Sequence, residues 1–143
     1  MTAPAVLLVD DDATFLQHAA RFLGQGGAVR VVGTARSADE GVALAQSVRP
    51  DVVVLDLSMP DTDGFAALPI FRAAAPGAAV VVVTTHEGSH YRTRALALGA
   101  AGFVPKRRLV DDLLPEIVRL CPPLPRAAPA PPALGTAPPA RPA

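Results

Sequence analysis

DVVVLDLSMPDTDG, residues 51–64, joins an apolar run to an aspartate and then to a glycine-containing turn. Val52–Leu55 is uninterrupted by polar residues, which is typical of a short strand covered on both faces. Similar runs occur elsewhere in the chain, at Val6–Val9, Val29–Val32, Val80–Val83 and, in shorter form, Gly102–Val104. The five runs begin 22 to 28 residues apart, which leaves room for a helix between neighbours. The pattern predicts five βα units around a parallel sheet.

The segments between the runs carry helix signals. Asp12 is expected to cap the first helix, and Ser37 with Glu40 forms a capping-box pattern at the start of the second. Pro69 should kink or delay the third helix, and Pro115 is tolerable in the fifth if it falls in the first turn. The helices are expected after Asp12, after Ser37, from near Gly64 to Ala75, from Ser89 to Leu98 and from Asp112 to Leu120.

The composition limits the class of protein. Thirteen basic residues balance 13 acidic ones, which argues against a dedicated nucleic-acid binder. The N-terminus lacks the features of a signal peptide, and no apolar stretch approaches the 18 or so residues of a membrane span. Cys121 has no second cysteine with which to pair. We expect a cytoplasmic protein that makes no contact with a membrane.

The chain divides by composition near residue 121. Residues 1–121 have ordinary globular composition and a common size for one domain. Residues 122–143 consist mainly of Pro and Ala, and nine of the 16 prolines lie there. Such a segment cannot bury enough apolar surface to offset its chain entropy, so we expect a disordered tail.

Charged and hydroxyl residues gather at the expected strand ends. Asp10 and Asp11 follow the first run, Asp56 the third, Thr84 the fourth, and Lys106 lies two residues past the fifth. Ligands of open parallel sheets bind beyond the carboxyl ends of the strands. A doubly wound sheet of strand order 2-1-3-4-5 would make the four contributing strands neighbours, with the second strand, which supplies no charge, at the edge.

The residue types at these ends indicate a chemistry. Carboxylates about 4 Å apart repel by roughly 4 kcal/mol at an effective dielectric of about 20, so they must be protonated or share a cation. An all-oxygen set suits Mg²⁺. Lys106 adds a point charge and Thr84 a hydroxyl donor. Together they form a site suited to accept a phosphoryl group on one aspartate.

Four segments carry a family resemblance. VLLVDDD (6–12), DVVVLDLSMPDTDG (51–64), VVVVTT (80–85) and GAAGFVPK (99–106) resemble, in order and spacing, the receiver domain of two-component response regulators. The resemblance covers residues 5–121 and implies a flavodoxin-like receiver fold. It is closest to receivers that precede a helix-turn-helix domain; because the tail holds no such domain, direct DNA binding is not expected.

The resemblance implies roles for individual residues. Asp56 would be the phosphoacceptor, with Mg²⁺ held by Asp10, Asp11, the Asp56 side chain and the backbone carbonyl of Ser58. Self-catalysed transfer to Asp56 and slow dephosphorylation would be the only enzymatic activity.

The remaining implied roles concern switching. Thr84 would move towards the phosphoryl group, Lys106 would pair with it, and Phe103 would reposition on activation. The donor would be a sensor histidine kinase or a phosphotransfer protein. Output would pass to an unknown downstream protein through the face of the fourth and fifth helices, which could also form a homodimer and carries Arg92, Arg94, Arg107 and Arg108.

Two other hypotheses remain open. Asp10, Asp12 and Thr14 spell the Asp-x-Asp-x-Thr motif of haloacid-dehalogenase-like phosphatases, in which Asp10 would be the nucleophile and Asp12 the general acid/base. Alternatively, the chain could be a receiver-like docking module that works without phosphorylation. The residue that carries a trapped phosphoryl group distinguishes the first alternative, and the effect of Asp56→Asn on partner binding distinguishes the second.

Overall fold

The computed structural model describes residues 3–58, 63–85 and 88–121. The predicted tail, 122–143, lies outside the described residues. Five strands form one sheet in the order β2-β1-β3-β4-β5, and each neighbouring pair is parallel. This confirms the predicted fold class and strand order. The strands are β1 (Ala5–Val9), β2 (Arg30–Ala35), β3 (Val52–Asp56), β4 (Ala79–Thr84) and β5 (Gly102–Pro105).

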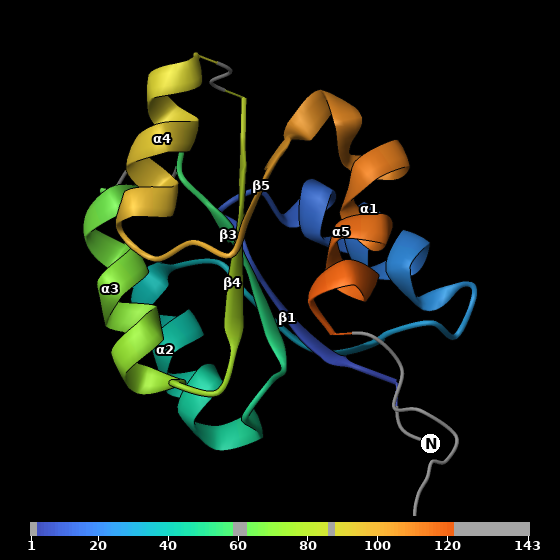
Figure 1. Cartoon of the computed structure of the whole chain (residues 1–143). Coiled ribbons are helices and arrows are strands. Elements are labelled where there is room, and N and C mark those ends of the chain that lie inside the picture. The colour runs from blue at the N-terminus through green and yellow to red at the C-terminus, as the bar shows by residue number, and fades with distance from the viewer. Residues whose placement is uncertain (1–2, 59–62, 86–87, 122–143) are drawn as a thin grey trace, which may run out of the picture.

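Helices cover both faces of the sheet. The helices are α1 (Ala13–Gly24), α2 (Ala38–Val48), α3 (Gly64–Ala74), α4 (Ser89–Ala97) and α5 (Leu114–Leu120). Helices α2, α3 and α4 pack on one face, and α1 and α5 on the other (Figure 1). All five residues of both β1 and β3 are buried, as their uninterrupted apolar runs predicted. Among the helices of the described chain, none is both long enough and apolar enough to cross a membrane.

Strand β2 differs from its prediction. The sequence predicts a strand that begins at Val29 and ends in Gly33 and Thr34, whereas β2 begins at Arg30 and continues one residue further, to Ala35. The register with β1 shifts between Val6 and Leu7, and only Ala35 of β2 is fully buried. The apolar run was shorter than the strand because an edge strand is covered less completely than a central one.

The helix starts follow the predicted caps. The Asp12 carboxylate accepts from the amides of Thr14 and Phe15, and the Ser37 hydroxyl accepts from the amide of Glu40. The Glu40 carboxylate binds the amide of Arg36, one residue before the position that a capping box would use. Helix α3 begins at Gly64, so Pro69 inside it does not delay its start.

The last helix is more complex than predicted. A 3₁₀ turn at Lys106–Arg108 leads into a π-helical turn at Leu109–Leu113, and α5 begins at Leu114 and not at Asp112. The turn lets Leu109 and Leu113 reach the core. Pro115 lies in the first turn of α5, as predicted.

Gly64 brings the start of α3 close to the end of β3. A Cβ atom at this position would lie 2.5 Å from the Cα of Leu57 and 2.8 Å from its carbonyl oxygen. Because both neighbours are backbone atoms, they could not move aside without shifting the chain that follows Asp56. Glycine here therefore fixes the segment next to the predicted phosphoacceptor.

Candidate active site

The carboxyl ends of four strands bring the predicted site residues together. Asp10 directly follows β1, Asp56 ends β3, Thr84 ends β4, and Lys106 directly follows β5. The sheet order makes these strands neighbours, so the four side chains lie together at the carboxyl ends of the strands. Asp10, Asp56 and Thr84 are buried, with exposed fractions of 1%, 1% and 0%.

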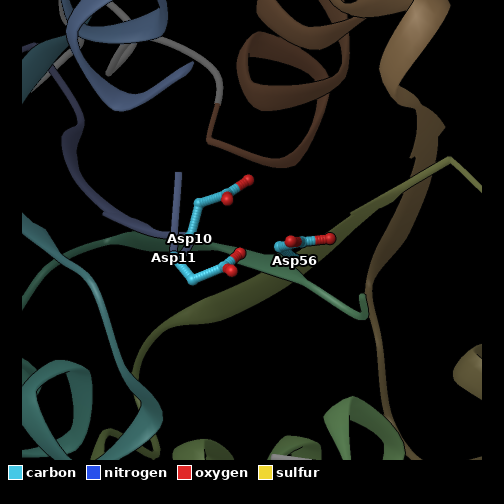
Figure 2. Close-up of side chains that lie close together, drawn as sticks. All are labelled: Asp10, Asp11 and Asp56. Atoms are coloured by element: carbon cyan, nitrogen blue, oxygen red, sulfur yellow. The ribbon is translucent and has the colours of Figure 1, made fainter. Parts of the chain in front are cut away.

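Three aspartates form an acidic cluster. One carboxylate oxygen from each of Asp10, Asp11 and Asp56 lies within 4.8 Å of the others. Figure 2 shows the three side chains close together at the ends of two neighbouring strands. At that separation two ionised carboxylates repel by about 3 kcal/mol at an effective dielectric of about 20. The cluster is therefore suited to hold a hard cation with oxygen ligands.

Backbone amides orient the two buried carboxylates in the same way. The Asp12 amide donates to Asp10 Oδ1 at 2.9 Å, and the Ser58 amide donates to Asp56 Oδ1 at 2.9 Å. In each case the amide lies two residues after the aspartate, so a tight turn fixes the side chain. The second oxygen of each carboxylate then faces Lys106.

Lys106 joins the two buried carboxylates. Its Nζ lies 2.7 Å from Asp10 Oδ2 and 3.4 Å from Asp56 Oδ2. The side chain is 18% exposed, so Lys106 lies largely inside the site. One ammonium cannot balance three carboxylates, and the remaining negative charge matches that of a divalent cation.

The pKa values of Asp10 and Lys106 are both raised, but for different reasons. The pKa of Asp10 is raised to about 6: burial is the main cause and the Asp56 charge adds to it, whereas Lys106 and the Asp12 amide act to lower the pKa. For Lys106, burial acts to lower the pKa, but its bonds and charge contacts with Asp10 and Asp56 outweigh this effect and raise it. Lys106 therefore stays protonated while Asp10 is poised to titrate between acid and neutral pH.

Ser58 contacts the predicted switch residue. Its hydroxyl lies 3.3 Å from Thr84 Oγ1, and its amide holds Asp56. The sequence predicted a role only for the backbone carbonyl of Ser58. The side chain adds a direct link between the phosphoacceptor segment and Thr84.

Phe103 is buried in the core formed with α2, α3 and α4, and only 8% of it is exposed. Phe103 also lines a groove of about 340 Å³ between α4 and α5, together with Arg92, Pro115 and Arg119. A movement of Phe103 would therefore change the shape of the groove.

Two contacts were missed by the sequence analysis. Arg36, directly after β2, donates from Nε and Nη2 to the carbonyl of Asp11 at 3.3 and 3.2 Å. The ring of Phe15 on α1 lies 4.4 Å from Lys106 Nζ. The position of Arg36 just past a strand end was a usable signal, whereas nothing in the sequence placed Phe15 beside Lys106.

The predicted basic patch is partly neutralised. Of its arginines, Arg108 pairs with Asp112 at 3.1 Å; Arg119, which was not part of the predicted patch, pairs with Glu116 at 2.7 Å. Arg94 is 4.2 Å from the ring centroid of Phe65 on α3. Asp112 and Glu116 thus supply negative charge on the α5 side of this face, beside the arginines.

The dehalogenase-like interpretation requires Asp12 as a general acid/base. Asp12 is exposed, and its Oδ1 accepts from two amides of the α1 first turn. Asp56, which has no task in that interpretation, instead lies inside the acidic cluster. The arrangement favours Asp56 over Asp10 as the reacting carboxylate.

Comparisons with known proteins agree with this arrangement. The sequence matches the family described as Response regulator receiver domain over residues 6–118. A protein-glutamate methylesterase/protein-glutamine glutaminase of Maricaulis maris is 35% identical over 103 residues, which cover 71% of this chain and 26% of that protein. The chain spans about a quarter to a third of the length of the methylesterases that it matches.

Solved structures are similar over most of the described fold. The signal receiver domain of the response regulator NarL from Mycobacterium tuberculosis gives a TM-score of 0.71 at 31% identity, covering 83% of this chain and 93% of that one. A response regulator from Burkholderia pseudomallei, solved with a phosphorylated aspartic acid, a calcium ion and citrate, gives 0.68 at 26% identity, covering 78% and 64%.

The family match covers most of the chain, so the chain belongs to the receiver domain family of response regulators. Receiver domains serve two-component signalling, interact with histidine kinases or phosphotransfer proteins, and typically bind Mg²⁺ at an acidic pocket.

Proposed function

We propose that this receiver accepts a phosphoryl group on Asp56 and passes the signal on through protein contacts. The observation that carries the proposal is the setting of the Asp56 carboxylate. It is buried, oriented by the Ser58 amide, faced by Lys106, and crowded by Asp10 and Asp11. This setting prepares one carboxylate to react and supplies positive charge beside it.

The reaction is an in-line transfer from a phosphohistidine of a sensor histidine kinase or a phosphotransfer protein. One oxygen of Asp56 forms a bond to phosphorus while the bond from phosphorus to the imidazole nitrogen breaks. The electron pair stays on that nitrogen. In the later hydrolysis, a water oxygen attacks phosphorus, inorganic phosphate leaves with the added oxygen, and the Asp56 carboxylate is restored.

The acidic cluster fits Mg²⁺. Asp10, Asp11, Asp56 and the carbonyl of Ser58 would hold the ion, since the three carboxylates already lie close together and their charge is only partly balanced by Lys106. When bound, Mg²⁺ offsets negative charge on the phosphoryl oxygens. The response regulator from Burkholderia pseudomallei was solved with a calcium ion and a phosphorylated aspartic acid, which supports the proposal that a divalent cation accompanies phosphorylation here.

Lys106 and Thr84 are proposed to bind the phosphoryl group and to change position when it is present. Lys106 would move its ammonium from Asp10 to a phosphoryl oxygen, and Thr84 would donate its hydroxyl to another. The hydroxyl of Ser58, 3.3 Å from that of Thr84, would lose its present neighbour as Thr84 moves. Phe103 would then shift, and the population of active conformers would rise.

The proposed docking surface is the face of α4, β5 and α5. Its groove contains Phe103 and both acidic and basic side chains, so a downstream partner would need complementary charges of both signs. A second copy of this chain is one such partner, which would give a homodimer.

The test is to incubate the full chain with acetyl phosphate and Mg²⁺ and to measure the intact mass. A gain of one phosphoryl group is expected, mapped to Asp56 and lost in Asp56→Asn. Asp10→Asn is expected to react more slowly but at the same residue. Labelling of Asp10 would contradict the proposal and favour the dehalogenase-like interpretation.

The docking-module alternative is tested in cells. Asp56→Asn is expected to abolish the response to the cognate kinase. An unchanged output would show that docking does not need phosphate.

A further inference from the structure

The ring of Phe15 lies against the ammonium of Lys106. The distance from Nζ to the ring centroid is 4.4 Å, well within the range of cation–π attraction. Phe15 lies in the first turn of α1, and its amide is bound by the Asp12 carboxylate. The ring is therefore attached to the same loop that carries Asp10 and Asp11.

Lys106 has two kinds of contact in this site. Asp10 and Asp56 attract it as carboxylates, at 2.7 and 3.4 Å. Both carboxylates are also proposed ligands of the cation, so their hold on the ammonium weakens when that charge is shared. The Phe15 ring does not bind the cation, so its attraction for the Lys106 ammonium persists when the cation is bound.

Partial burial makes this ring contact effective. Lys106 is 18% exposed, and Phe15 packs half-buried against the core beneath α1 and α5. A ring face held by core packing gives the flexible four-carbon side chain of Lys106 a fixed support. Without it, the ammonium would be free to swing towards solvent once Asp10 is occupied.

We propose that Phe15 is a positioning residue for Lys106, holding its ammonium beside Asp56 while the acidic cluster is occupied. The inference rests on the proposed function, because it concerns the delivery of Lys106 to the phosphoryl group. Phe15 does not touch the reacting atoms, so its effect must pass entirely through Lys106.

The test compares three variants of the full chain. Phe15→Leu keeps an apolar side chain but removes the π face, and Phe15→Tyr keeps the face. Phe22→Leu is the matched control, because Phe22 is also half-buried on α1 against the same core. Phe22 is two turns away, about 10 Å along the helix axis.

The readouts are the rate of phosphorylation by acetyl phosphate at saturating Mg²⁺ and the affinity for beryllofluoride, which imitates a bound phosphoryl group. Phe15→Leu is expected to lower both by roughly three- to tenfold, the size of a partly desolvated cation–π contact. Phe15→Tyr is expected to restore most of each. Phe22→Leu is expected to stay within about twofold of wild type.

A double substitution tests whether the effect of Phe15 passes through Lys106. In a Lys106→Ala background, Phe15→Leu is expected to cause no further loss of beryllofluoride affinity. A further loss there, an equal loss in Phe22→Leu, or wild-type behaviour of Phe15→Leu would overturn the inference. If Phe15→Leu does not fold, as judged by thermal unfolding, Phe15→Met replaces it in the same comparisons.

The proposed function fails separately from this inference. Absence of phosphorylation on Asp56 in the wild-type chain would remove the proposed function. Normal wild-type phosphorylation with an unaffected Phe15→Leu variant would remove only the role of Phe15.

Discussion

The two ends of strand β3 each carry an aspartate, in very different surroundings. Asp51, just before the strand, is exposed, and its Oδ2 accepts from the Ala5 amide at 2.8 Å. Asp56, at the other end, is 1% exposed and faces Lys106 at 3.4 Å. The first carboxylate is satisfied by the backbone of a neighbouring strand, whereas the second is crowded by other carboxylates.

A large cavity lies at the Asp51 end of β3, away from the acidic cluster. A cavity of about 620 Å³ lies beside Asp51, between the carboxyl ends of α2 and α3, and is bordered by Arg49, Pro50 and Pro76. The acidic cluster lies at the other end of the strands, where β1 and β3 have their carboxyl ends. The comparison teaches that crowded charge, and not a cavity alone, distinguishes the end of β3 where phosphorylation is proposed.

The largest expected effect separates the two aspartates directly. Asp56→Asn is expected to reduce phosphorylation by acetyl phosphate more than about a thousandfold, because an amide replaces the nucleophilic carboxylate. Asp51→Asn is expected to leave the rate within about twofold of wild type. Intact-mass measurement under identical Mg²⁺ checks both. An equal loss of phosphorylation in both variants would show that the two aspartates do not differ in function.

The basic residues at the two ends give a second comparison. Lys106→Ala is expected to slow phosphorylation roughly a hundredfold, since a charge next to the transferred group is removed. Arg49→Ala, at the cavity end, is expected to change it little. The measurement is the initial rate at saturating Mg²⁺, and full switching in Lys106→Ala would refute the role given to that residue.

Asp10 predicts an unusual pH dependence of stability. Its pKa in the folded protein is raised to about 6 from an ordinary 3.8, so the folded state binds more protons than the unfolded state between these values. Protonated Asp10 therefore contributes its full stabilisation below about pH 4, and this stabilisation is lost as the pH rises through 6. Without Mg²⁺, the free energy of unfolding is expected to fall by roughly 3 kcal/mol over this range.

Urea unfolding of Mg²⁺-free protein at pH 4.5 and 7 checks this contribution. Asp10→Asn is expected to lose this pH dependence, and Asp51→Asn, at the other end of the sheet, is expected to keep it. Added Mg²⁺ is expected to raise the stability of the wild-type chain at pH 7. A wild-type difference that persists unchanged in Asp10→Asn would assign it to another group.

The smallest effect is expected from truncating Asp51. Asp51→Ala leaves the Ala5 amide without its carboxylate partner and is expected to cost about 1 kcal/mol of unfolding free energy. The melting temperature should fall by a few degrees while phosphorylation is unchanged. A loss of phosphorylation would mean that the two ends of β3 are coupled.

The parts of the fold that could be predicted from the sequence are those where burial is complete. Val6–Val9 and Val52–Leu55 are covered on both faces, so their composition alone indicated central strands. The acidic residues followed because parallel strands deliver their carboxyl ends to one edge. The caps Asp12 and Ser37 were also predictable, since they act within a few residues of themselves.

The parts that were missed depend on partial burial or on tertiary contact. Strand β2 is half-covered, so its apolar run stopped before the strand did. The π turn at Leu109–Leu113 is set by how its leucines reach the core, which no local pattern encodes. The contacts of Arg36 with Asp11 and of Phe15 with Lys106 join distant segments.

Lys106 is the single lysine of this chain, and its side chain is partly exposed. Apart from the terminal amine, an amine-selective reagent has one target on the whole molecule, and an isotope placed on lysine Nζ gives one signal. Occupancy of the site can therefore be followed through a natural chemical label, without any engineered reporter.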